Sequence, residues 1–158
     1  MSTTLQMIEL RTGGVADLVL VDQVMQQAFD PRYGEAWTRN QCLGILAMPG
    51  VWLTIASLDG VPAGFALSRV VVDEAELLLL ATVPALRRRG VAAALLSSVI
   101  NDANSLNAIN LHLEVREGNE AIKLYHHTGF VKVGERRNYY RGNAGQAFNA
   151  FTYSRDLR

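Results

Sequence analysis

The sequence predicts an α/β fold with one mixed, mostly antiparallel central sheet and helices on both faces of that sheet. The first supporting observation is the order of the segments, which reads strand, two helices, three strands, helix, strand, helix and two strands. The second is the run Leu77–Val83, which is apolar at almost every position, as in a central strand covered on both faces. A length of 158 residues fits one domain, so we expect residues 1–158 to fold as a single unit.

The N-terminal part is expected to form one strand and two helices. Met7–Arg11 is a candidate first strand, and apolar residues then recur at helical spacing through Val15–Phe29. The Asp-Pro pair that follows ends this helix, because proline disfavours helical geometry in the residue before it. A second helix begins at Thr38, which forms a capping box with Gln41, and the next Pro-Gly pair ends it.

Three consecutive strands are predicted in the middle of the chain, at Val51–Leu58, Val61–Val72 and Ala75–Val83. Asp59-Gly60 is a strong hairpin signal, because both central residues of a type I′ turn need a positive φ. Asp73-Glu74 marks the second turn. Short turns join antiparallel neighbours, so these three strands are expected to form a meander.

The C-terminal half alternates helices and strands. Val91–Ala103 has helical spacing, and Ile109–Val115 alternates strictly between apolar and polar residues, as a strand does. A short helix is expected to be capped by Asn119 and to end at Gly129. The last segments are a strand, a loop and a strand: Phe130–Arg137, Tyr139–Gln146 and Ala147–Arg155.

The composition argues against several functional classes. Fifteen basic and fifteen acidic residues balance, and a neutral chain lacks the charge excess on which broad nucleic-acid binding depends. One cysteine, Cys42, allows neither an internal disulfide nor a cysteine-built zinc site. Met1–Glu9 lacks the basic start and long apolar run of a signal peptide, and Leu77–Val83 is too short to span a bilayer. We therefore expect a cytoplasmic protein that does not act on nucleic acid or membranes.

Three histidines raise the question of a metal site. His112 shares a strand face with Glu114, while His126 and His127 lie on the helix that follows. Adjacent helical residues point about 100° apart, so these two histidines do not easily bind one ion. We expect no metal, and either helical histidine is a candidate secondary proton carrier.

The stretch Leu86–Leu96 reads LRRRGVAAALL, with three arginines and a glycine just before a predicted helix. The first four backbone N–H groups of a helix lack internal partners, and their dipoles make this end an anion site. Gly90, Ala92 and Ala93 leave the approach open, and the arginines add cations. The pattern indicates a phosphate or pyrophosphate site; the alternative is a solvated basic turn before an alanine-rich helix. The sequence has no P-loop and no dinucleotide-binding glycine motif.

The pattern Arg87-x-x-Gly90-x-Ala92 resembles the pyrophosphate loop of the GNAT acetyltransferases, Q/R-x-x-G-x-G/A. The segments VVVDEAELLLLATVPALRRRG, LHLEVREGN, LYHHTGF and ERRNYYRG resemble the RimI-type branch, which acetylates the N-terminal amine of a ribosomal protein. The resemblance extends from about Val51 to the C-terminus. It implies the GNAT fold, acetyl-CoA as donor, and a protein N-terminus, of the ribosomal-protein alanine type, as acceptor. The alternatives are a GNAT enzyme for a small amine or a lysine, and a non-catalytic acyl-CoA-binding module.

The implied reaction transfers acetyl from a thioester to an amine, which needs a base for the amine proton and an acid for the departing thiolate. Glu114 lies on the polar face of its strand and matches the base position of the family, where the carboxylate usually acts through water. The alternative for Glu114 is a surface carboxylate paired with Arg116 or His112. Tyr125 matches the thiolate-protonating tyrosine of the family; the alternative is an aromatic residue that packs its short helix onto the sheet.

The resemblance also implies a donor-binding site. The backbone of the strand before the arginines is expected to bind the pantetheine arm, and one of its N–H groups to polarise the thioester carbonyl. The arginine-glycine loop is expected to bind the pyrophosphate. The family spaces an asparagine as N-x-x-A-x-x-L-Y, and the interval from Asn119 to Tyr125 is one residue shorter. The expected donor-binding residues are Leu80, Ala81, Thr82, Arg87, Arg88, Arg89, Gly90, Val91, Ala92, Ala93 and Asn119.

Two segments are candidates for the acceptor site. By resemblance, the region of Arg137 and Tyr139 walls the acceptor, with the tyrosine stacking on or bonding to a peptide backbone. The alternative for this region is an exposed basic-aromatic turn or weak RNA contact. Glu35 and Trp37, between the first two helices, are expected to form the opposite wall, where Glu35 attracts a cationic N-terminus.

Overall fold

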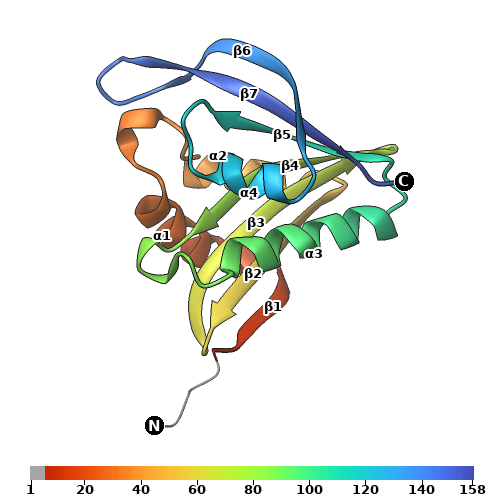
Figure 1. Cartoon of the computed structure of the whole chain (residues 1–158). Coiled ribbons are helices and arrows are strands. Elements are labelled where there is room, and N and C mark those ends of the chain that lie inside the picture. The colour runs from red at the N-terminus through yellow and green to blue at the C-terminus, as the bar shows by residue number, and fades with distance from the viewer. Residues whose placement is uncertain (1–5) are drawn as a thin grey trace, which may run out of the picture.

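One seven-stranded sheet forms the centre of the protein, seen in a computed structural model that describes residues 6–158 (Figure 1). The strand order is β1-β2-β3-β4-β5-β7-β6, and every neighbouring pair is antiparallel except β4 and β5. The predicted mixed, mostly antiparallel sheet is therefore confirmed. Residues 1–5 of the segment Met1–Glu9, in which we expect no signal peptide, lie outside the described residues. The strands are β1 (Ile8–Gly13), β2 (Val51–Leu58), β3 (Val61–Val71), β4 (Glu74–Thr82), β5 (Asn110–Arg116), β6 (Val131–Arg141) and β7 (Ala147–Asp156).

Helices cover both faces of this sheet, as predicted. Residues of α1 (Leu18–Ala28) and α2 (Arg39–Leu46) belong to one apolar cluster, and residues of α3 (Val91–Ser105) and α4 (Ala121–His127) belong to another. Figure 1 shows α3 on the near face of the sheet. Burying an apolar side chain contributes about 1.5–3 kcal/mol, so these two clusters hold the short helices in place. No helix within residues 6–158 is long and apolar enough to cross a membrane.

Local signals set the ends of the helices. The capping box of α2 is confirmed, because Thr38 Oγ1 accepts from the Gln41 N–H at 3.2 Å and Gln41 Oε1 accepts from the Thr38 N–H at 2.8 Å. The chain leaves α4 through Gly129, which has a φ of +92°. The Phe130 N–H then bonds to the Tyr125 carbonyl at 3.0 Å, a pattern typical of glycine-terminated helices.

The first helix begins later than predicted. Val15–Asp17 forms a 3₁₀ turn, and α1 starts only at Leu18. The Gly14 N–H donates to the Asp17 carboxylate at 2.9 Å, and the Asp17 N–H donates to the Gly14 carbonyl at 2.9 Å. These two bonds close a tighter turn than an α-helix allows, which apolar spacing alone does not reveal.

A β-bulge divides β4. The ladder with β3 pairs Leu67 with Leu79 and Ser68 with Leu77, so Leu78 is an extra residue. Before the bulge, Leu77 packs in the α3 cluster; after it, Leu79 packs in the α1 cluster. The leucines of β4 do not alternate with polar residues, because both faces of the sheet are buried at this strand. The bulge also changes which face a given residue occupies.

The strand β6 is longer than predicted, which corrects the expected loop after it. We expected the strand to end at Arg137, but it continues to Arg141 and leaves only a short turn before β7. Residues 137–139 form a bulge opposite Asn149, and pairing with β7 then resumes. The Asn149 Oδ1 accepts from the Asn138 N–H at 3.1 Å, which stabilises the bulge without ending the strand.

Candidate active site

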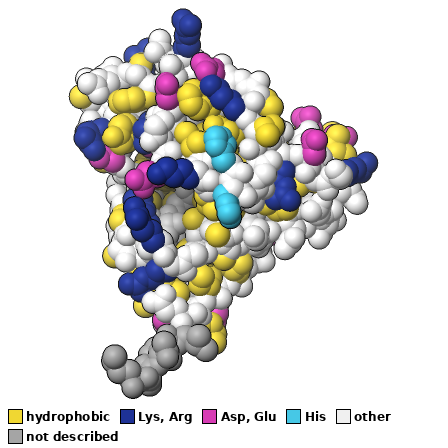
Figure 2. Space-filling model, in the orientation of Figure 1, with side chains coloured by type: hydrophobic (Ala, Val, Ile, Leu, Met, Phe, Trp, Pro, Cys, Tyr) yellow, Lys and Arg dark blue, Asp and Glu magenta, His cyan; other side chains and the backbone are white. Residues whose placement is uncertain are grey.

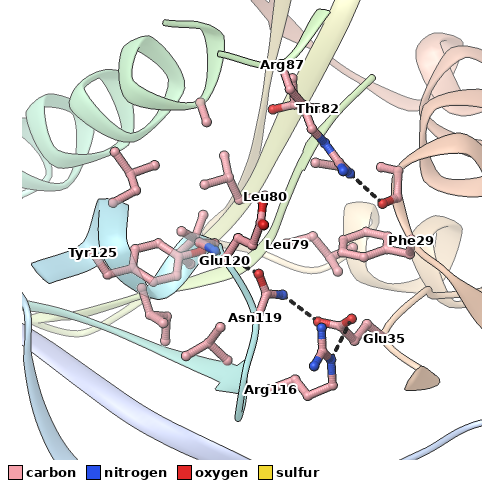
Figure 3. Close-up of a pocket in the computed structure, with 18 of the residues that line it drawn as sticks. Phe29, Glu35, Leu79, Leu80, Thr82, Arg87, Arg116, Asn119, Glu120 and Tyr125 are labelled. Carbon is pink, nitrogen blue, oxygen red and sulfur yellow. Dashed lines mark hydrogen bonds and ion pairs between the residues drawn. The ribbon is translucent and has the colours of Figure 1, made fainter. Parts of the chain in front are cut away.

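A cavity of about 690 Å³ opens where β4 and β5 separate (Figure 3). The parallel ladder between these strands starts at Glu74 and Asn110, and stops after Leu77 and Leu113, at the bulge of β4. Among residues 6–158, no strand pairs with this edge of β4 beyond Leu77, so its backbone groups are available to a ligand. Figure 2 shows a hollow at the left of the face, with Lys and Arg side chains around it.

The N-terminal end of α3 lies at this cavity and offers unpaired donors. The first helical hydrogen bond runs from the Ala94 N–H to the Gly90 carbonyl at 2.9 Å, and Gly90 has no side chain with which to cap the earlier N–H groups. The backbone is left-handed at Gly90 (φ +85°) and at Arg88 (φ +62°). The conformation at Arg88 costs about 1–3 kcal/mol, and such strain is concentrated at functional sites. This geometry suits an anion such as a phosphate.

The three arginines before α3 have different surroundings. Arg87 Nη2 donates to the carbonyl of Ala28, the last residue of α1, at 2.7 Å, and so links the loop to α1 beside the cavity (Figure 3). The partial negative charge at a helix C-terminus favours this contact. Arg88 also lines the cavity, whereas Arg89 does not. The backbone of the loop and the side chain of Arg88 are thus the parts best placed for an anion.

Glu114 lines the cavity from β5, with its side chain 13% exposed. Its carboxylate accepts from Thr152 Oγ1 at 2.8 Å and from Arg136 Nε at 2.9 Å. The alternation of β5 is confirmed, because its apolar residues are buried on the opposite face. Of the partners considered from the sequence, Arg116 pairs with Glu35 instead, and His112 Nε2 lies 3.8 Å from the Glu76 carboxylate. Glu114 is therefore a well-oriented carboxylate beside the cavity, as a base must be.

Two tyrosines border the same cavity, Tyr125 from α4 and Tyr140 from β6. Burial raises the pKa of both hydroxyls above the usual range for tyrosine, and the nearby charge of Glu35 adds to this. Both stay protonated at neutral pH and can donate to a ligand. Tyr125 is 5% exposed, and its ring lies edge-on to Phe130 at 5.7 Å between centroids, so it also packs in the core. The Tyr140 hydroxyl donates to the Glu114 carbonyl at 3.4 Å.

A mostly buried ionic network crosses the cavity floor (Figure 3). Glu35 accepts from Arg116 Nε at 3.1 Å and from Asn119 Nδ2 at 2.7 Å, and the charged side chains are 10% and 12% exposed. The Arg116 guanidinium lies 3.7 Å from the centre of the Tyr33 ring. Asn119 was predicted to cap α4, but the N-cap is Glu120; Asn119 precedes it, and its Oδ1 accepts from the Ala121 N–H at 2.9 Å. The charge of Glu35 is balanced by Arg116, so its expected attraction for a cationic N-terminus is weakened.

The remaining expected residues divide into two sets. Trp37, Arg137 and Tyr139 do not line the cavity: Trp37 packs against the α1 cluster, and Tyr139 is 49% exposed. Their role in acceptor binding stays a prediction. Within residues 6–158, no group of three His, Cys, Asp or Glu side chains is arranged to hold a metal ion. The expected donor-binding residues that do line the cavity are Leu80, Ala81, Thr82, Arg87, Arg88, Gly90, Val91, Ala92, Ala93 and Asn119.

Several residues that line the cavity were not selected from the sequence, among them Phe29, Tyr33, Arg116 and Tyr140. Tyr140 is adjacent to Tyr139, which we selected from the sequence. The bulge in β6 decides which of these two tyrosines faces the cavity. The sequence carries no signal for that choice. Arg116 directly follows the predicted alternating strand. Its charge, in a position where the alternation predicts a polar residue, was the signal that could have selected it.

Comparison with known proteins identifies the family. The model of the acetyltransferase (GNAT) family matches residues 19–130. The [ribosomal protein bS18]-alanine N-acetyltransferase of Salmonella typhimurium is 43% identical over 79 residues, which are 49% of this chain and 53% of that protein. The chain thus matches about half the length of this curated relative. The enzyme of that name from Haemophilus ducreyi is 35% identical over 115 residues, or 72% of this chain and 79% of that protein.

The fold agrees with this match over almost the whole chain. The crystal structure of the ribosomal-protein-S18-alanine N-acetyltransferase from Escherichia coli superposes with a TM-score of 0.84 at 28% identity. The superposition covers 96% of this chain and 94% of that one. The family model, the relatives and the structure agree, and the chain belongs to the GNAT acetyltransferase family.

Proposed function

We propose that this chain is an acetyl-CoA-dependent N-acetyltransferase that acts on the N-terminal α-amine of a protein. The observation that carries this proposal is that one cavity joins an anion site, an unpaired strand edge and an oriented carboxylate. GNAT acetyltransferases take acetyl from acetyl-CoA. The N-terminal end of α3 would bind the pyrophosphate, and the free edge of β4 would bind the pantetheine arm and the thioester carbonyl.

The chemistry needs a base for the amine and a proton donor for the thiolate. Glu114, directly or through one water, takes a proton from the protonated amine, and the amine nitrogen then bonds to the thioester carbon. The carbon–sulfur bond breaks, the nitrogen releases its second proton to solvent, and the leaving thiolate takes a proton from a donor that solvent then reprotonates. Tyr125 is our candidate for this donor, because it lines the cavity and, with its pKa raised by burial, its hydroxyl is protonated at neutral pH. Tyr140, with the same direction of shift, is the second candidate.

The acceptor class is inferred from the relatives, which are named for the N-terminal alanine of ribosomal protein bS18 and are 35–43% identical. We therefore propose a ribosomal protein as the acceptor and the cytoplasm as the location. Small amines and lysine side chains remain the alternative acceptors, since the same base and donor site serve them. A non-catalytic acyl-CoA-binding module would not need the two hydrogen bonds that orient Glu114.

Thiol release from acetyl-CoA with three peptides tests the acceptor class. The first peptide begins with a free alanine followed by a basic sequence, the second is N-terminally blocked with an internal lysine, and the third begins with proline. Turnover on the first peptide alone is expected. Turnover on the blocked peptide would identify a lysine acetyltransferase. Silence on all three with acetyl-CoA still bound would favour a small-amine enzyme or a binding module.

Substitution of the base tests the mechanism. A general base contributes about 10²–10⁴-fold to the rate, so Glu114→Gln is expected to lower kcat/KM on the alanine peptide by a factor in that range. Glu74→Gln is the matched control, because Glu74 is an exposed carboxylate at the opposite end of β4. Unchanged turnover in Glu114→Gln would show that another group is the base.

A further inference from the structure

Both carboxylate oxygens of Glu114 are occupied, but by partners of different kinds. Thr152 lies directly opposite Glu114 in the β5–β7 ladder and donates to Oε2 at 2.8 Å. Arg136 comes from β6, one strand further away, and its Nε donates to Oε1 at 2.9 Å. The first contact is fixed by sheet register, whereas the second depends on one long side chain that reaches over β7.

The Arg136 side chain is held weakly. It is 62% exposed, whereas that of Glu114 is 13% exposed, so the ion pair lies at the mouth of the cavity rather than inside it. Its neighbour across the ladder is Ala150, and pairing is interrupted immediately after Arg136 by the bulge. Its guanidinium also lies 5.7 Å from the centre of the Tyr139 ring. Ion pairs with such exposure are easily exchanged.

We propose that Arg136 occupies the place on Glu114 that the protonated acceptor amine takes, so that the acceptor must displace an internal cation. Both groups are cationic N–H donors to one carboxylate oxygen. When Arg136 leaves, the Thr152 hydroxyl still holds Oε2, so the carboxylate stays oriented for proton removal. Arg136 is then a specificity-determining residue. An acceptor with an ammonium group replaces the positive charge of Arg136 beside Glu114, whereas a neutral ligand leaves the carboxylate without a cation.

This inference rests on the proposed function, in which Glu114 is the base and a cationic amine is the acceptor. It adds a prediction that the general mechanism does not make. Removing Arg136 should improve acceptor binding, because the acceptor amine loses its competitor for Glu114. If Arg136 instead bound the substrate directly, its removal should weaken acceptor binding.

Steady-state kinetics on the alanine peptide tests the sign of the effect. Arg136→Gln is expected to lower the acceptor KM by a factor of about two to five, the range for an exposed ion pair, with kcat and the acetyl-CoA KM unchanged. Arg136→Lys keeps the cation and should restore a KM close to that of the wild type. Lys132→Gln removes an exposed charge of the same strand that does not line the cavity, and should leave the KM unchanged.

A double-mutant cycle on peptide affinity separates displacement from general repulsion. Calorimetry with the alanine peptide and CoA compares the wild type with Arg136→Gln, Glu114→Gln and the double variant. Tighter binding in Arg136→Gln should disappear when Glu114 is also replaced. An unchanged or higher acceptor KM in Arg136→Gln overturns the proposal, as does equal tightening in both backgrounds.

The same set distinguishes this inference from the proposed function. An inactive Glu114→Gln together with an unchanged KM in Arg136→Gln rejects the displacement and leaves the base in place. An active Glu114→Gln rejects the base and the displacement together.

Discussion

Replacing Glu35 by glutamine tests whether the ionic network on the cavity floor holds the structure together. Glu35 receives hydrogen bonds from Arg116 and Asn119, which lie 81 and 84 positions away in the chain. The network therefore links the segment after α1 to the start of α4. Glutamine keeps the size of the side chain but removes the charge, and its amide nitrogen cannot accept one of the two bonds.

The cost follows from burial. A hydrogen bond to a charged group contributes about 1.5–3 kcal/mol, and breaking a fully buried ion pair costs about 3–5 kcal/mol. With side chains 10% and 12% exposed, this pair lies close to the buried limit. The Tyr33 ring, 3.7 Å from the Arg116 guanidinium, stays beside the cation in the variant, so the charge keeps one partner and the cost falls toward the lower end of this range. We expect Glu35→Gln to lower the unfolding free energy by about 2–3 kcal/mol.

Urea denaturation measures this change. With a slope of about 1–3 kcal/mol per molar, a loss of this size moves the midpoint by about 0.7–3 M at constant slope. Glu135→Gln is the matched control, because Glu135 pairs with Lys132 at 49% and 39% exposure and should contribute less than about 1 kcal/mol. A Glu35→Gln variant no less stable than the Glu135→Gln control would refute the reasoning.

Two further predictions concern close packing and alkaline pH. A Cβ on Gly142 would overlap the Arg32 carbonyl oxygen, so Gly142→Ala should lower stability by about 1–3 kcal/mol in urea, whereas Gly44→Ala, on an open helix surface, should raise it by up to about 1 kcal/mol. Equal effects of the two changes would contradict the close approach. The raised pKa of Tyr125 means that the folded chain keeps a proton that the unfolded chain releases near pH 10, so stability should be complete below that pH and fall as pH rises above it. Urea unfolding between about pH 8 and pH 11 measures this decline in stability. The Tyr125→Phe variant should show a flatter decline. A wild-type stability that stays constant to pH 11 would be inconsistent with the burial of that hydroxyl.

The sequence by itself determined most of the elements and the glycine turn before α3, because their signals act over a few neighbouring residues. The Thr38 capping box formed as predicted, and Asp59 and Gly60 both adopt the positive φ of a hairpin turn, at 49° and 81°. Gly90 at the start of α3 has the left-handed backbone that favours glycine. The alternation of β5 likewise placed Glu114 on its polar face, since a strand has a period of two.

Only the tertiary structure decided what these residues contact. The bulge opposite Asn149 carries pairing in β6 beyond its predicted end, and Tyr140 thereby reaches the cavity while Tyr139 stays exposed. The partners of Glu114 and Glu35 come from strands and loops that are distant in the chain and adjacent only once the sheet has formed. Such contacts depend on the register and the bulges of several strands together. A local pattern in the sequence does not determine how those strands are aligned.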